Sequence, residues 1–346
     1  MRILVADSLP DTARRELTEH GHECHYEPDI TAGELPDRLA TPDAPDVLVV
    51  RSTPVNSAAL DAATKLRFVI RAGSGTNTID CATADKHGVS VCNVPGRNAT
   101  AVAELALALL LALDRAIPDN VVALRNGHWN KKQYAHATGI AGRDVGVIGL
   151  GSIGLAFAER AHALGATIHA VAKPDRPPEV AQRAAAIGVD FVDHLAELAR
   201  RCDVLSLHVP ANEATRGLLD RSLLELLTPG AIILNTARAE LIDEQALTDM
   251  MDSKGIRAGV DVFADEPGTS TGSIHSALAQ HPNTYGTHHI GASTQQAQHA
   301  IAAEVVRMVN AFREGTTPHL VNSPEAAVAT DRPNVLLSST SPGGGA

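Results

Sequence analysis

The chain has 346 residues, of which 44% are apolar and 20% are charged, and its formal net charge is -11. This length is sufficient for two domains with separate cores. The acidic balance offers no positive surface to nucleic acid or to an anionic membrane, so we expect small molecules or other proteins as partners. The cysteines lie at positions 24, 81, 92 and 202 without CxxC spacing, which favours a reducing cytoplasm and predicts neither disulfides nor a metal site.

The first part of the chain predicts a small parallel α/β unit. Its start, "MRILVADSLP", is a short strand without the features of a signal peptide. Apolar runs at residues 47–50, 68–71 and 89–93 predict further strands, with helices at "SAALDAAT" and "ATADKHG" between them. The segment "HECH", residues 22–25, is interpreted as a solvated loop, because nothing elsewhere in the sequence completes a metal site.

The longest apolar run, residues 101–113, predicts a buried helix that is too short to cross a bilayer. After a polar segment, strand candidates recur at helix-length intervals, which predicts a doubly wound parallel sheet. These candidates are "DVGVIGLG", "TIHAVA", "DFVD", "CDVLSLHVP", "GAIILNTA", "IRAGVDVF" and "NTYGTHH". Residues 326–346 are rich in Ser, Pro, Ala and Gly, a composition that predicts a disordered tail.

The motif "GLGSIG", residues 149–154, predicts a dinucleotide site. It follows the strand "VGVI" and opens the helical run "LAFAERAHALG", which is the context that the motif requires. Gly149 would make the tight turn, Gly151 would let the backbone approach a pyrophosphate, and Gly154 would let helix and strand pack closely. The helix N-terminus would then face the phosphates.

The end of the next strand bears on the choice between NAD and NADP. An NAD site usually has an acidic residue about twenty residues after the loop, whereas an NADP site supplies cations for a 2′-phosphate. Here Ala172 is followed by Lys173, Pro174, Asp175 and Arg176. The missing acid and the two cations favour NADP. Two alternatives stay open: both cations are solvated and NAD is accepted, or a loop shift brings Asp175 to the ribose.

Three polar side chains follow three later strands. Arg238 follows "AIILNTA", Glu266 follows "GVDVF", and His289 lies in "YGTHHIGAST". Because the carboxyl ends of parallel strands share one edge of the sheet, we expect these side chains to converge beside the nicotinamide. A guanidinium grips a carboxylate at two points, a histidine exchanges a proton near neutral pH, and a carboxylate stabilises an imidazolium. Oxidation of a 2-hydroxy acid needs these groups.

From Met1 to about Asn322 the chain resembles the D-isomer-specific 2-hydroxyacid dehydrogenases. The motifs that carry the resemblance, in family order, are "RAGSGTNTID", "NVPGRNATAVAELALALLLALDR", "GHWNKK", "GLGSIG", "HVPANEATRGLL", "NTARAELIDE", "AGVDVFADEP" and "HIGASTQQAQ". The resemblance is greatest to the members that act on phosphoglycerate, in a short form without a regulatory domain. It implies an oxidoreductase that uses NAD(P). The alternatives are a reductase of glyoxylate, hydroxypyruvate or another 2-keto acid and, in a different class, a dinucleotide-sensing corepressor-like binding protein.

The resemblance implies an α/β protein in which a nucleotide-binding domain is inserted into a flavodoxin-like substrate domain, both built on doubly wound parallel sheets. Residues 1–98 and 291–325 would form the substrate domain, and residues 99–290 would form the dinucleotide-binding Rossmann domain. The resemblance also implies a homodimer, with the segment around Trp129 at the contact. Lys131 and Lys132 would be either surface charges or phosphate ligands for the neighbouring subunit.

The resemblance assigns roles to single residues. Arg238 would bind the substrate carboxylate and carbonyl oxygen, His289 would be the acid/base, and Glu266 would hold His289 and favour its charged form. With the glycine loop and the two cations, the expected cofactor-binding residues are Ser74, Gly149, Gly151, Ser152, Ile153, Gly154, Lys173, Arg176, Val209, Thr236, Ala237 and Asp261. The expected substrate-binding residues are Arg51, Gly73, Ser74, Gly75, Arg238 and His289. No metal is expected.

Two positions depart from the family pattern. Ala239 replaces a usual glycine, which raises the question of whether that loop needs backbone angles that only glycine adopts easily. His288 replaces the proline that usually precedes the catalytic histidine. We assign the acid/base role to His289 because the "HIGAST" motif fixes its register.

Overall fold

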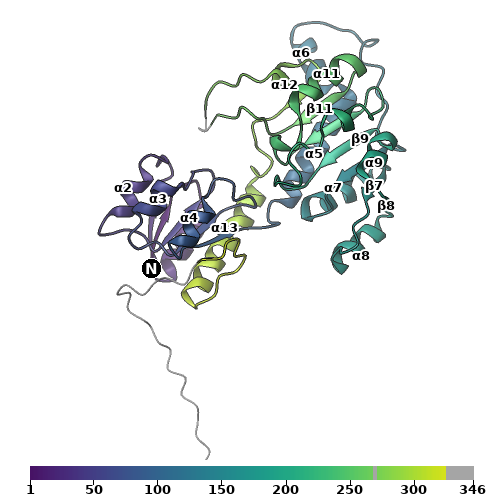
Figure 1. Ribbon diagram of the computed structural model, residues 1–346. Helices are drawn as coiled ribbons and strands as arrows, with labels where there is room; N and C mark the ends of the chain where they lie inside the picture. Colours follow the sequence, from purple (N-terminus) through teal and green to yellow (C-terminus); the bar gives the residue numbers. More distant parts are fainter. Residues whose placement is uncertain (268–270, 325–346) are drawn as a thin grey trace, which may run out of the picture. The chain divides into compact units, whose positions relative to one another are not determined.

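The computed structural model describes residues 1–267 and 271–324, and they divide into two compact units (Figure 1). The first unit comprises residues 1–72, 76–93 and the chain from residue 305, and the second comprises residues 73–75 and 94–304. Helix α13 (Gln295–Arg313) is divided between them after residue 304. The predicted disordered tail, residues 326–346, lies outside the described residues.

The first unit contains a five-stranded parallel sheet in the order β2-β1-β3-β4-β5. Its strands are β1 (Arg2–Val5), β2 (Glu23–Tyr26), β3 (Val47–Val50), β4 (Phe68–Arg71) and β5 (Ser90–Asn93). Its complete helices are α1 (Asp11–Glu19), α2 (Leu35–Ala40), α3 (Ser57–Ala62) and α4 (Cys81–Lys86). Every residue of β3 is buried, as expected for a parallel strand covered on both faces.

The prediction of a solvated loop at residues 22–25 is wrong, because Glu23–Tyr26 forms strand β2. This strand pairs with β1 at the edge of the sheet, and its residues are only partly buried or exposed. Edge strands are stabilised largely by their backbone ladder, so the sequence shows no apolar pattern there. His22 is itself buried, and its Nε2 lies 3.1 Å from Oδ1 of Asn310 in α13.

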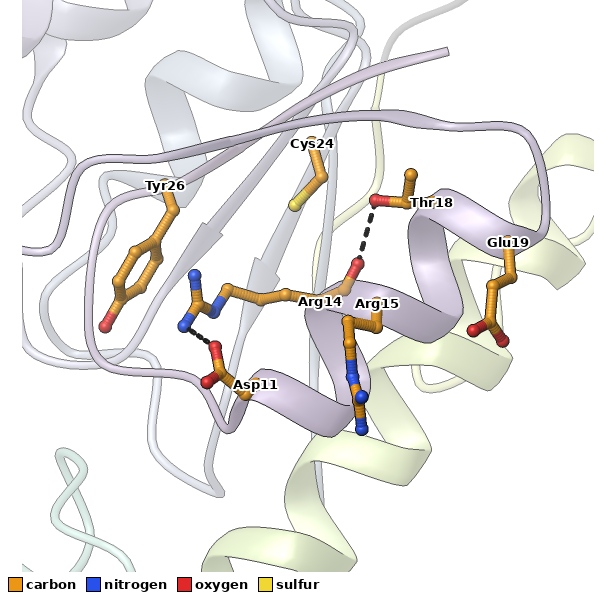
Figure 2. A pocket seen from close by; sticks show the side chains of 7 residues that line it. All are labelled: Asp11, Arg14, Arg15, Thr18, Glu19, Cys24 and Tyr26. Atoms are coloured by element: carbon orange, nitrogen blue, oxygen red, sulfur yellow. Dashed lines mark hydrogen bonds and ion pairs between the residues drawn. The ribbon is translucent and has the colours of Figure 1, made fainter.

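Helix α1 and strand β2 flank a hollow on the first unit (Figure 2). The guanidinium of Arg14 lies over the ring of Tyr26, 3.7 Å from its centroid, and pairs with Asp11. The hollow is lined by Asp11, Arg14, Arg15, Thr18, Glu19, Cys24 and Tyr26. None of these belongs to the predicted cofactor or substrate residues.

The second unit contains a seven-stranded parallel sheet in the order β12-β11-β10-β9-β6-β7-β8. Its strands are β6 (Asp144–Ile148), β7 (Thr167–Val171), β8 (Asp190–Val192), β9 (Val204–Leu207), β10 (Ile232–Asn235), β11 (Arg257–Val260) and β12 (Thr284–Gly286). Its helices, besides the start of α13, are α5 (Ala99–Arg115), α6 (Ile117–Arg125), α7 (Ser152–Ala163), α8 (Pro178–Ala186), α9 (Leu195–Arg201), α10 (Arg221–Leu224), the 3₁₀ helix η1 (Ala239–Leu241), α11 (Glu244–Lys254) and α12 (Ala277–Gln280). The predicted α/β class with doubly wound parallel sheets is confirmed.

Apolar side chains bury both faces of this larger sheet. Ile232 and Leu234 of β10 belong to one core cluster with α5 and α7, whereas Ile233 belongs to another with α9, α10 and α11. Successive strand residues point to opposite faces, so a continuous apolar strand needs helices on both sides. The direction in which strands are added reverses between β6 and β9, and a ligand crevice is expected at the carboxyl ends there. Within the part of the chain that the structure describes, no helix has the length and apolar character needed to span a bilayer.

Candidate active site

Three glycines shape the turn between β6 and α7. Gly149 has a φ of 98°, and a Cβ there would lie 2.6 Å from Cγ1 of Val209. A Cβ at Gly154 would lie only 1.8 Å from the carbonyl oxygen of Gly149, so a side chain would push the helix away from the strand. Gly151 differs, because a Cβ there would meet no atom within 4 Å. The turn therefore leaves open space beside the Gly151 backbone.

The surroundings of this turn fit a bound dinucleotide. Helix α7 starts at Ser152, and its N-cap, Gly151, makes no side-chain capping bond. The first N–H groups of a helix without a cap are suited to bind an anion such as a pyrophosphate. Thr236, just after β10, is buried, and its hydroxyl lacks a hydrogen-bond partner among the described residues. Since buried hydroxyls are normally bonded, this one is suited to a ligand.

No carboxylate is present at the end of β7 or in the three residues that follow it. The two predicted cations there differ in their surroundings. Lys173 is exposed. Arg176 donates from Nη2 to the carbonyl oxygen of Val171 at 3.0 Å, and its guanidinium lies 4.8 Å from the ring centroid of Phe191. Burial lowers the pKa of Arg176. Arg176 is therefore held against the ends of β7 and β8, while Lys173 extends into solvent.

His289 and Glu266 form a direct pair. Nδ1 of His289 lies 2.7 Å from Oε2 of Glu266, and the other carboxylate oxygen accepts from the backbone N–H of Phe263 at 2.9 Å. Burial opposes ionisation of Glu266, but these two bonds and the charges of His289 and Arg238 together outweigh it, so the pKa of Glu266 is lowered. The pair occupies Nδ1 and leaves Nε2 of a half-exposed ring for proton exchange.

Arg238 lies close enough to Glu266 for its charge to act on that carboxylate. It precedes η1, and its Nη1 donates to the carbonyl oxygen of Ala237 at 2.6 Å. Ala239 starts η1 and does not have a positive φ. Alanine therefore satisfies the loop geometry at a position where the family usually has glycine.

Asp261, predicted at the nicotinamide amide, bonds the loop that carries His289. Its Oδ1 accepts from the Thr287 hydroxyl at 2.6 Å and from the Ile290 N–H at 2.8 Å. Its Oδ2 accepts from the N–H of Gly291 at 2.8 Å, and its carbonyl oxygen accepts from the N–H of His289 at 2.9 Å. His289 has a φ of 51°, an uncommon value for a residue with a side chain. Asp261 thus holds the backbone on both sides of this strained residue, which the sequence motif did not predict.

The predicted substrate residues are distributed over both units. In the first unit, Arg51 follows β3, and its N–H donates to Oδ2 of Asp7 at 2.7 Å. Arg71, the last residue of β4, is in register with Val50 of β3. Burial lowers the pKa of Arg51, although Asp7 opposes this effect.

The turn Gly73–Gly75 groups with the second unit. The Ser74 hydroxyl lies 3.1 Å from Oδ1 of Asn98, and the carbonyl oxygen of Gly73 accepts from the N–H of Val94 at 2.9 Å. This turn is therefore bonded to the segment that leads into α5.

Comparison with known proteins identifies the family. Residues 107–291 match the model of the D-isomer specific 2-hydroxyacid dehydrogenase NAD binding domain. The chain belongs to this dehydrogenase family. The matched range contains the glycine turn, Arg238, Glu266 and His289, so the family's NAD-binding domain lies within the second unit.

Three relatives illustrate the range of this family. The chain is 37% identical to D-3-phosphoglycerate dehydrogenase of Methanocaldococcus jannaschii over 97% of its own length and 63% of that protein. It is 40% identical to hydroxypyruvate reductase of Thermotoga maritima over 78% of its own length and 84% of that protein. The NAD⁺-bound 3-phosphoglycerate dehydrogenase of Entamoeba histolytica has a TM-score of 0.75 and 25% identity, covering 94% and 99% of the two chains. The chain spans about three fifths of the length of the first of these relatives.

Proposed function

We propose that the chain is a nicotinamide-dependent dehydrogenase of D-2-hydroxy acids, which in reverse reduces 2-keto acids. The observation that carries this proposal is the pair of His289 and Glu266 at 2.7 Å, with the charge of Arg238 acting on the same carboxylate. All three side chains lie in the unit that matches the family's NAD-binding domain. They supply an acid/base, its charge partner and a carboxylate anchor.

The proposed reaction assigns one step to each group. When bound, the nicotinamide ring would take up the hydride from C2 of the substrate or return it. Arg238 would bind the substrate carboxylate in a two-point contact. His289 would remove the C2 hydroxyl proton through Nε2 during oxidation and deliver it during reduction, while Glu266 stabilises the imidazolium. Oxidation needs the neutral ring and reduction the charged ring, so the two directions should have opposite pH dependence.

For the substrate, we propose D-3-phosphoglycerate, with the first unit as substrate domain. A phosphorylated substrate needs cations beyond those that bind its carboxylate. Arg51, just after β3, is the residue that we propose for that task, on the family motif alone. The alternative, reduction of hydroxypyruvate or glyoxylate, is supported by the 40% identity to the hydroxypyruvate reductase of Thermotoga maritima.

We propose NADP as the preferred cofactor. No carboxylate is present at residues 171–174 to accept a bond from a ribose hydroxyl or to repel a 2′-phosphate. Lys173 is exposed beside that position, and Arg176 is held near the end of β7. The family's NAD-binding domain supports a nicotinamide cofactor, and the choice between NAD and NADP rests on these residues alone.

We also propose a cytoplasmic homodimer joined through α6 and the segment after it. Every residue of α6 is at least partly exposed. Ile117, Val121 and Leu124, at positions i, i+4 and i+7, share one face of α6 and are 48%, 38% and 56% exposed. Trp129 is 81% exposed. Clustered apolar side chains in water mark an interaction surface.

A substrate panel tests the proposed function. The purified chain is given 3-phosphohydroxypyruvate, hydroxypyruvate and glyoxylate, each with NADH and with NADPH, and cofactor oxidation is followed. We expect turnover with kcat/KM about tenfold higher for the phosphorylated acid and for NADPH. A preference for hydroxypyruvate would favour the alternative substrate. Tight cofactor binding without turnover of any acid would contradict the enzyme proposal and favour the corepressor-like class.

A further inference from the structure

The side chain of Asn235, the last residue of β10, bonds the loop that carries Arg238. Asn235 is 1% exposed. Its Nδ2 donates to the carbonyl oxygen of Arg238 at 2.8 Å, and its Oδ1 accepts from the N–H of Ala237 at 3.1 Å. The two groups of the side-chain amide thus bond two residues of the short turn between β10 and η1.

The backbone of Asn235 is fixed in the interior of the sheet. It is in register with Leu207 of β9 on one side and with Val260 of β11 on the other. Its carbonyl oxygen accepts from the N–H of Asp261 at 2.9 Å. The amide therefore connects a rigid strand end to a short loop, and the loop position depends on that connection.

Arg238 has an extended backbone, with φ -147° and ψ 141°. The direction of its side chain therefore follows from where its own carbonyl group is held. That carbonyl oxygen accepts from Nδ2 of Asn235 and, at 3.3 Å, from the N–H of Leu241 in η1. Of these two bonds, only the one from Asn235 comes from the sheet.

We propose that Asn235 is a positioning residue that sets the place of the Arg238 guanidinium for the substrate carboxylate. This inference rests on the proposed function, because it assumes that Arg238 binds that carboxylate. An amide supplies a donor to one group and an acceptor to another, whereas a carboxylate of the same shape would place an oxygen against the Arg238 carbonyl. A small displacement of a positioning group is enough to slow a reaction strongly.

The first experiment compares Asn235→Asp and Asn235→Ala with the parent. We expect kcat/KM for 3-phosphohydroxypyruvate and hydroxypyruvate to fall about 10- to 100-fold, mainly through a higher KM. A far-UV circular dichroism spectrum like the parent's shows that the variants are folded. The dissociation constants of NADH and NADPH, measured by fluorescence titration, should rise by less than KM for the acid, because Thr236 and Ala237 of the same turn are expected cofactor contacts. Asn283→Asp is the matched control, since this amide bonds the Ile256 carbonyl oxygen before β11, at the amino ends of the strands. It should keep the parent's kcat/KM.

The second experiment repeats Asn235→Ala in an Arg238→Ala background. If Asn235 acts through Arg238, the double variant should be no slower than Arg238→Ala alone. Full additivity, an unchanged kcat/KM in both single Asn235 variants, or loss of cofactor binding in both would overturn the inference. If Arg238→Ala itself turned over like the parent, the proposed function would fall as well, so the two failures are distinguishable.

Discussion

The two carboxylate oxygens of Glu266 have separate partners, the His289 ring and the Phe263 N–H. Glu266→Gln keeps the shape and removes the charge that stabilises the imidazolium. We therefore expect the pH profile of 2-keto acid reduction to move toward acid, with kcat/KM at neutral pH falling about tenfold. The measurement is kcat/KM between pH 5 and pH 9, at about one pH unit per step.

The neighbouring Asp265→Asn is the control for this change, because it removes one exposed charge beside Glu266. Its profile should overlay that of the parent. Equal shifts in both variants would mean that the total negative charge of the loop, and not the direct pair with Glu266, acts on His289. The proposed pairing would then be incorrect.

His208 gives a pH effect of another origin. Burial lowers its pKa to about 3 from the ordinary histidine value of 6.5, and its Nε2 lies 2.8 Å from the Ser206 hydroxyl. The unfolded chain takes up this proton below pH 6.5 while the folded chain does not, so stability is complete above that pH and is lost as pH falls toward 3. At about 1.4 kcal/mol for each pH unit, the loss from pH 6.5 to pH 5 is about 2 kcal/mol.

Urea unfolding at pH 7 and pH 5 measures this effect in the parent and in His208→Gln. The variant should lose less stability over this range, because glutamine does not titrate. Identical losses would show that His208 binds a proton equally well in the folded and the unfolded chain, and would contradict the prediction.

The glycine turn between β6 and α7 contains one residue with a packing role, Gly154, and one with a proposed binding role, Gly151. Gly154→Ala would place a Cβ 1.8 Å from the Gly149 carbonyl oxygen. We expect this overpacking to lower the free energy of unfolding by about 2 to 3 kcal/mol. Gly151→Ala meets no protein atom within 4 Å, so it should keep stability but obstruct the pyrophosphate and weaken cofactor binding about 100-fold.

Thermal unfolding and cofactor titration of both variants test this separation. Weak binding by Gly154→Ala alone, with full affinity in Gly151→Ala, would contradict the placement of the pyrophosphate beside residue 151.

Some elements could be predicted from sequence for a physical reason. Strands β3 and β4 are buried on both faces and match the predicted ranges 47–50 and 68–71 residue for residue. Strand β2 was missed because its stability comes from pairing with β1, a contact that no local pattern records. The roles of Asn235 and Asp261 were missed for the same reason, since both depend on loops that the fold brings beside them. The expectation that Arg238, Glu266 and His289 lie at one edge of the sheet required only the order of parallel strands, which the sequence pattern supplies.

For the whole molecule, the exposed apolar side chains of α6 bear on assembly. We expect Val121→Glu combined with Leu124→Glu, on one face of α6, to convert a homodimer into monomers, because two charges would be buried at the contact. Sedimentation equilibrium of parent and variant measures the mass directly. A parent that is monomeric at all concentrations, or a double variant that stays dimeric, would contradict the assignment of this surface. Exchanging two exposed residues of α8, as in Glu179→Gln with Gln182→Glu, supplies a control that should remain dimeric.

The proposed reaction depends most on proton transfer by His289. The most direct test is the rate of 2-keto acid reduction, with cofactor saturating, by His289→Asn and by its neighbour variant His288→Asn. We predict that His289→Asn is about a thousandfold slower than the parent with unchanged cofactor affinity, while His288→Asn stays close to the parent rate. A His289→Asn variant as fast as the parent, or a loss confined to His288→Asn, would contradict the account.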